Sequence, residues 1–208
     1  MQPIQSAFAE RWPEAEIVNL LDDGLSLDRA REAELTEAMI ERFVAFGTYG
    51  HRMGAGGILV TCSAFGPAID RMIEALPIPV LKPNEAMFQA AIGQGRRVGM
   101  LATFGPSVGT MTEEFDEFVA RSGRPASLTT VLVADAIDLL KKGDADSHNR
   151  LVAARAPELA DHDAIMLAHF STSRAAEAVR RVVGIPVLTA PHAAVMRMRE
   201  MIEACAGR

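Results

Sequence analysis

The sequence lacks the features that mark several large classes of protein. Its 208 residues include two cysteines, one tryptophan and one tyrosine. No apolar run approaches the roughly 18 to 20 residues that span a bilayer, and the first residues lack the basic and apolar regions of a signal peptide. We therefore expect a soluble protein of the cytoplasm that makes no contact with membranes.

An excess of positive charge and metal-binding clusters are lacking as well. Lys and Arg number 21 against 27 Asp and Glu, so the formal net charge is −6, and no basic stripe offers itself to nucleic acid. Cysteine and histidine never come together at the spacings of a zinc site, which predicts no bound metal. Cys62 and Cys205 are far apart and are expected to be free thiols. We therefore expect a small molecule as the partner of this protein.

What the sequence does contain is a series of short apolar runs. Hydrophobic residues make up 49% of the chain and charged residues 23%, which is typical of a folded protein. The runs are nearly continuous in apolar character, as in strands covered on both faces, and the segments between them are long enough for crossover helices. This pattern predicts an α/β fold with parallel sheets flanked by helices. The predicted strands lie within residues 16–22, 57–63, 78–84, 97–104, 127–135, 164–171 and 185–191.

An internal repeat indicates two similar halves. Shifted by 107 positions, "LVTCSAFGPAIDRMIEALPIPVLKPNEAM" from residue 59 lies without gaps over "MLAHFSTSRAAEAVRRVVGIPVLTAPHAA" from residue 166. We therefore predict two pseudo-symmetric lobes, divided at "AIGQGRR" into residues 1–94 and 95–208. The second lobe opens with a strand whose counterpart in the first would precede residue 1. Either the start is truncated, or the first lobe manages with one strand fewer.

The repeat places two ionisable residues at equivalent positions. Cys62 falls on His169, and each follows a predicted strand. Ligands of parallel sheets collect at the carboxyl ends of the strands, so we predict a cleft between the lobes with both side chains facing it. The alternatives are a small buried cysteine and a structural histidine with a hydrogen-bond partner. The pairing favours a catalytic Cys62, with His169 as general acid or base.

Other polar residues near the strand ends are candidates for binding. The backbone N–H groups of Ser63 and Ala64, at the start of the next helix, suit a carboxylate. Asn84 and His192 follow the two "IPVL" strands and are expected to line the same cleft, or merely to begin helices. Hydroxyl groups after other strand ends can hold carboxylate or carbonyl oxygens, with helix capping as the alternative. These residues are Thr103, Ser107, Ser171 and Thr172.

Four motifs carry a resemblance to a known family. "GILVTCSAFGPAI", "IPVLKPNEAM", "RVGMLATFGPS" and "IPVLTAP" resemble the aspartate/glutamate/hydantoin racemase superfamily, which also includes arylmalonate decarboxylase and maleate isomerase. The resemblance covers nearly the whole chain, and the order and spacing of the motifs carry it. It implies two pseudo-symmetric α/β lobes around a site that needs neither pyridoxal phosphate nor metal.

In the usual racemase of this family, one cysteine from each lobe exchanges a proton on opposite faces of the substrate's α-carbon. Cys62 matches the first cysteine, whereas His169 occupies the position of the second. The resemblance implies a cofactor-independent racemase or epimerase of a small carboxylate-bearing amino acid or hydantoin-like compound. A decarboxylase or maleate-isomerase-like enzyme using Cys62 alone is the alternative, and a non-catalytic binding protein is a third. The size, eleven methionines and balanced hydropathy predict a homo-oligomer.

Overall fold

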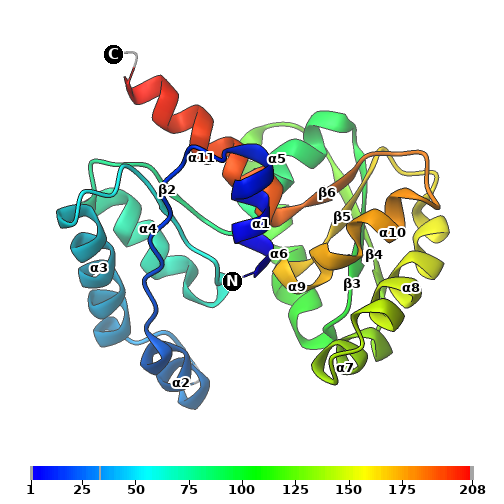
Figure 1. Cartoon of the computed structure of the whole chain (residues 1–208), viewed down its shortest axis with the longest axis horizontal. Coiled ribbons are helices and arrows are strands. Elements are labelled where there is room, and N and C mark those ends of the chain that lie inside the picture. Colours follow the sequence, from blue (N-terminus) through cyan, green and yellow to red (C-terminus); the bar gives the residue numbers. More distant parts are fainter. Residues whose placement is uncertain (1, 33, 207–208) are drawn as a thin grey trace.

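The protein is a two-lobed α/β molecule. The computed structural model describes residues 2–32 and 34–206, apart from the side chains of residues 2, 26, 30, 63 and 206. Figure 1 shows the two lobes side by side, with helices packed around a separate parallel sheet in each. The predicted fold class is confirmed. No helix in the described ranges is long and apolar enough to cross a membrane.

The second lobe is built on a four-stranded sheet in which all neighbours are parallel. The strands stand in the order β4-β3-β5-β6. Every residue of β5 is fully buried, because its side chains enter a separate apolar core on each face of the sheet. Because β5 is buried on both faces, its sequence is a continuous run of apolar residues. The bounds are β3 Arg97–Ala102, β4 Ser127–Leu132, β5 Ala164–Leu167 and β6 Val187–Thr189.

Helices cover both faces of this sheet. On one face α5 and α6 pack against Met100 and Met166, with Phe88 and Phe115 in edge-to-face contact at 5.5 Å between ring centroids. On the other face α7, α8 and α10 enclose the second core. Their bounds are α5 Glu85–Gln94, α6 Val108–Ser122, α7 Asp135–Lys141, α8 Ala145–Arg155 and α10 Ala176–Arg180, with a 3-10 turn at Ala156–Leu159 and another at Ser173–Ala175.

The first lobe has a much smaller sheet. Two short parallel strands, β1 (Ile58–Leu59) and β2 (Val80–Leu81), pair with each other. The core beside them contains Phe43 and Phe65, whose rings stack with centroids 5.0 Å apart. The helices of this lobe are α2 Asp23–Arg31, α3 Glu37–Arg52 and α4 Gly66–Ala75.

The internal repeat is confirmed in three dimensions. Ile58 pairs with Val80 as Ile165 pairs with Val187, so equivalent partners are 107 positions apart. One helix from each half of the chain packs against the other lobe. From the second half, α11 (Ala190–Ala206) packs with α1 (Gln2–Arg11) near Leu59 of the first lobe. From the first half, α5 packs on the sheet of the second lobe. The division of the chain at residue 94 stays a prediction, and the contacts of α5 and α11 cross it.

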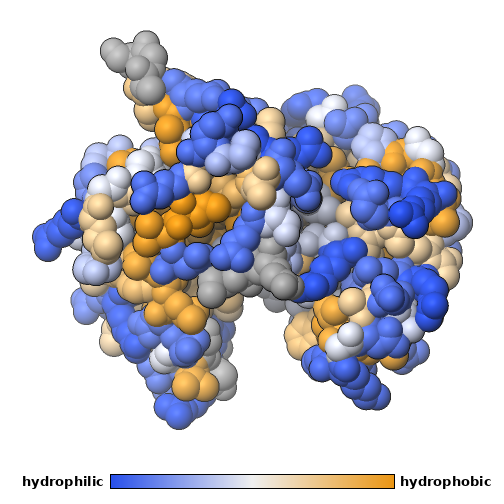
Figure 2. Space-filling model, viewed as in Figure 1, coloured by the Kyte–Doolittle hydropathy of each residue, from blue (hydrophilic) through white to orange (hydrophobic). Residues whose placement is uncertain are grey.

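The predicted strand at residues 16–22 is wrong. The segment is extended without strand pairing, and Val18 and Leu21 are 64% and 68% exposed. Its counterpart in the second lobe is β4, which pairs with β3 alone. In the described parts of the first lobe, β1 and β2 pair with each other and no strand pairs with this segment. Its apolar side chains contribute to the hydrophobic surface of the first lobe (Figure 2).

Candidate active site

The carboxyl ends of β3 and β5 bring four of the predicted polar residues together. Ser107 ends the 3-10 helix Gly105–Ser107 after β3, and His169 begins α9 (His169–Thr172) after β5. Ser107 Oγ lies 2.6 Å from His169 Nε2. Behind this pair, the hydroxyl oxygens of Thr103 and Thr172 are 3.1 Å apart and buried. Because β3 and β5 are neighbours in the sheet, residues that are more than 60 positions apart form one polar cluster.

His169 has an uncommon backbone conformation. Its φ of 64° lies in the left-handed region, which histidine enters more readily than most residues but at a cost in strain. The preceding residue is held to the sheet, since the Ala168 N–H donates to the Leu101 carbonyl at 2.9 Å. Burial lowers the pKa of the His169 imidazole and so favours its neutral form. Strain of this kind clusters at functional sites.

Cys62 lies at the equivalent strand end in the first lobe. The last strand-like contact is the Val60 N–H to the Leu81 carbonyl at 3.0 Å, and Cys62 then precedes the 3-10 helix Ser63–Phe65 that leads into α4. The thiol is exposed, so the alternative of a buried packing cysteine is wrong. Ala64 is exposed in the same short helix. The side chain of Ser63 lies outside what the structure describes.

Asn84 and His192 hold pairs of helices together. Asn84 is 4% exposed and donates from Nδ2 to Glu114 Oε2 at 2.9 Å, which links α5 to α6. His192 Nε2 lies 2.9 Å from Glu10 Oε2, and its Nδ1 lies 2.8 Å from Thr189 Oγ1, which links α11 to α1. In the described parts of the chain, no hydrogen bond joins the Asn84–Glu114 pair to the group formed by His192, Glu10 and Thr189. Their place in the cleft stays a prediction.

Sequence reasoning missed Glu114. Burial raises the pKa of its carboxyl group, although the hydrogen bond from Asn84 and the nearby Lys82 oppose the shift. Nothing in the sequence distinguishes this residue, because its neighbours on α6 are also acidic and only the fold decides which carboxylate faces inward. These neighbours are Glu113, Asp116 and Glu117.

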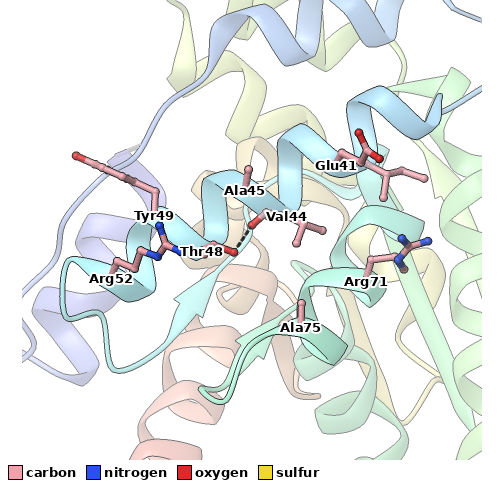
Figure 3. A pocket seen from close by; sticks show the side chains of 9 residues that line it. Glu41, Val44, Ala45, Thr48, Tyr49, Arg52, Arg71 and Ala75 are labelled. Carbon is pink, nitrogen blue, oxygen red and sulfur yellow. Dashed lines mark hydrogen bonds between the residues drawn. The ribbon is translucent and has the colours of Figure 1, made fainter.

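Two surface pockets are lined by residues that include neither Cys62 nor His169. One, of about 560 Å³, lies between α3 and α4 and is bordered by Tyr49, Arg52 and Arg71 (Figure 3). The other, of about 440 Å³, lies beside β6 and includes His192 among its lining residues. Figure 2 also shows an indentation between the lobes along the lower edge of the view. Within the described ranges, no three His, Cys, Asp or Glu side chains gather in an arrangement that could hold a metal ion.

Known sequences resemble this chain over much of its length. The sequence model of the Asp/Glu/Hydantoin racemase family matches residues 4–130, a range that includes Cys62 and ends before His169. An uncharacterized protein of Schizosaccharomyces pombe is 25% identical over 174 residues, which are 81% of this chain and 72% of that protein.

Solved structures resemble the whole fold. A glutamate racemase from Bacillus anthracis superposes with a TM-score of 0.66 at 14% identity, covering 98% of this chain and 78% of its own. Allantoin racemase from Pseudomonas fluorescens gives 0.66 at 17% identity, with coverages of 98% and 85%. Arylmalonate decarboxylase gives 0.59 at 20% identity, with coverages of 80% and 77%. At these identities the likeness establishes a shared fold.

Proposed function

The chain belongs to the Asp/Glu/hydantoin racemase family, and from this membership we propose that it is a cofactor-independent racemase or epimerase. The proposed substrates are small carboxylate-bearing amino acids or hydantoin-like compounds with an acidic α C–H bond. One observation carries the proposal: Cys62 and His169 occupy equivalent strand ends in two lobes that repeat the same register. Each can exchange a proton, and the two residues belong to different lobes.

The proposed reaction needs one proton transfer at each residue. The neutral imidazole of His169 takes the α-proton from one face, and the electron pair of the broken C–H bond passes into the carbonyl or carboxylate group as an enolate. The thiol of Cys62 then donates its proton to the other face, forming the new C–H bond. The enzyme ends with an imidazolium and a thiolate, which together catalyse the reverse inversion.

Fixed donors are proposed to hold the substrate and its developing charge. The backbone N–H groups of Ser63 and Ala64 follow Cys62, and Ser171 follows His169 in α9. Such donors stabilise an enolate because they are already oriented before charge develops. Thr103 is 1% exposed and its hydroxyl group hydrogen-bonds to that of Thr172. This buried contact joins the end of β3 to α9.

A second function is favoured by one departure from the family pattern. The second lobe has His169 where the resemblance predicts a cysteine, and the other cysteine, Cys205, lies at the end of α11. Cys62 acting alone could protonate one face after a decarboxylation or add to an alkene. The reaction would then yield one product without inverting the α-carbon.

The test is proton exchange in D₂O with single enantiomers of candidate substrates. A racemase incorporates deuterium at the α-carbon and loses optical rotation, whereas a decarboxylase releases CO₂. Cys62→Ser is expected to lower exchange by about 10³-fold or more, because the hydroxyl is a far weaker acid at neutral pH. His169→Asn is expected to retain exchange on one face while inversion is lost.

Cys205→Ser is the matched control, since it removes the other exposed thiol and should leave the rates unchanged. Full activity in Cys62→Ser would refute the assignment of that residue. Binding of substrates with neither exchange nor turnover would instead support the non-catalytic binding protein.

Two further proposals rest on composition. We propose that the chain works in the cytoplasm without nucleic-acid partners, and that it forms a homo-oligomer. Light scattering coupled to gel filtration tests the second, and a mass of 22.4 kDa at all concentrations would refute it.

A further inference from the structure

Ser107 makes two hydrogen-bond contacts with one hydroxyl group. Its Oγ lies 2.8 Å from the Phe104 carbonyl oxygen and 2.6 Å from Nε2 of His169. A serine hydroxyl has one proton to donate and two lone pairs to accept with. The two contacts therefore cannot both be donated by Ser107.

The carbonyl oxygen decides the direction of both bonds. Phe104 O can only accept, so the hydroxyl proton points to it. With that proton used, Ser107 Oγ can only accept from the ring, and Nε2 of His169 must carry a hydrogen. The opposite assignment would leave two oxygen lone pairs facing each other at 2.8 Å without a proton between them.

The other ring nitrogen is left without a protein partner. Across the part of the chain that the structure describes, no hydrogen bond reaches Nδ1 of His169. The residue is held on both sides, by Ala168 on Leu101 and by Thr172 on Thr103, so the ring is presented from a fixed turn. In the neutral ring, an N–H at Nε2 leaves the lone pair at Nδ1.

We propose that Ser107 is a positioning residue that holds His169 in the Nε2–H tautomer, so that Nδ1 is the nitrogen that exchanges the substrate proton. This inference rests on the proposed function of His169. It replaces the predicted role of Ser107 as a carboxylate ligand. The contact persists through the reaction, because the imidazolium formed at Nδ1 still donates from Nε2 to the same oxygen.

The tautomer can be measured without any substrate. In long-range ¹H–¹⁵N spectra of the full chain at a pH where the ring is neutral, His169 should show a protonated Nε2 and an unprotonated Nδ1. The signal is assigned by its loss in His169→Asn. A ring protonated at Nδ1 in the wild-type protein would overturn the proposal.

Three variants separate positioning from binding. Ser107→Ala should leave the ring in a mixture of tautomers and lower kcat about tenfold, with KM changed less than about twofold. Ser107→Thr keeps the hydroxyl and should restore both the spectrum and kcat. Ser122→Ala is the matched control, since Ser122 Oγ also donates to the carbonyl three residues earlier, at Val119, and should change neither readout.

The outcomes distinguish this inference from the proposed function. A raised KM with unchanged kcat in Ser107→Ala would overturn the positioning role and return Ser107 to the carboxylate. Full activity in His169→Asn would refute the proposed two-base function whatever the tautomer. A necessary His169 that is protonated at Nδ1 would refute the role of Ser107 alone.

Discussion

β5 of the second lobe is buried on both faces, whereas its counterpart β1 in the first lobe is only partly buried and is two residues long. Both strands have the same register with the next strand, so the repeat specifies pairing. They differ in their other neighbour: β5 also pairs with β3, and β1 has no described strand on that side. The length and burial of a strand thus depend on what lies on both of its edges.

The difference extends to the residues that the two strands present. His169 is held by hydrogen bonds of the adjacent Ala168, of Ser107 and of Thr172. Cys62 is exposed in extended backbone. The larger sheet therefore holds an oriented imidazole at its strand end, whereas the smaller sheet carries an exposed thiol.

The largest predicted difference in stability between the two lobes is at a pair of equivalent isoleucines. Ile165 is fully buried between β3 and β6, whereas its counterpart Ile58 is partly buried. Ile165→Ala should lower the free energy of unfolding by about 3 to 5 kcal/mol, and Ile58→Ala by about 1 to 2 kcal/mol, because the cost follows the cavity left behind. Urea unfolding monitored by circular dichroism measures both.

The valines that pair with these isoleucines are the control. Val187 and Val80 are 7% and 6% exposed, so Val187→Ala and Val80→Ala should cost similar amounts. Equal losses for the two isoleucine variants would contradict the difference drawn between the lobes.

Two carboxylates that link pairs of helices provide a second comparison, since Glu114 is partly buried between α5 and α6 and Glu10 is exposed beside α11. Burial raises the pKa of Glu114 above its ordinary 4.5, so the unfolded chain ionises first as the pH rises, and Glu114 opposes folding at neutral pH. Glu114→Gln should therefore raise the melting temperature at pH 7. The gain should disappear as the pH falls below about 4, where both states are protonated.

Glu10 should respond in the opposite direction. The hydrogen bond with His192 holds the pKa of Glu10 below 4.5, so its contribution to stability is present above that pH and is lost as the pH falls. Because Glu10 is largely exposed, Glu10→Gln should cost only a few tenths of a kcal/mol at pH 7. Calorimetric melting of both variants between pH 3 and 7 tests the pair. Curves that shift in the same direction would contradict it.

The smallest effect is expected in the extended segment at residues 16–22. Leu21 is 68% exposed, so Leu21→Gln should change the free energy of unfolding by less than about 0.5 kcal/mol. Leu128→Gln in β4 should cost about 1 to 2 kcal/mol, since Leu128 packs against the core of the second lobe. A large loss at Leu21 would mean that the segment is covered in solution.

The apolar runs predicted strands correctly where a described neighbour pairs with them, even for the partly exposed β1 and β4. Six of the seven predicted strands are present, whereas residues 16–22 are also rich in apolar residues but pair with no strand among the residues that the structure describes. The polar cluster was likewise predictable only in part from the sequence. The hydroxyl residues at the strand ends are visible in the sequence, but the contact of Ser107 with His169 requires β3 and β5 to be adjacent.

The sequence by itself determined the repeat, the parallel α/β class and the equivalence of Cys62 with His169, because apolar spacing and strand register are local and repeat along the chain. Only the tertiary structure decided which helices pack across the two lobes, which carboxylate on α6 is partly buried, and which hydroxyl group lies beside Nε2 of His169. Those outcomes depend on atoms that are distant in sequence, and a buried polar group takes whichever partner the fold places within reach.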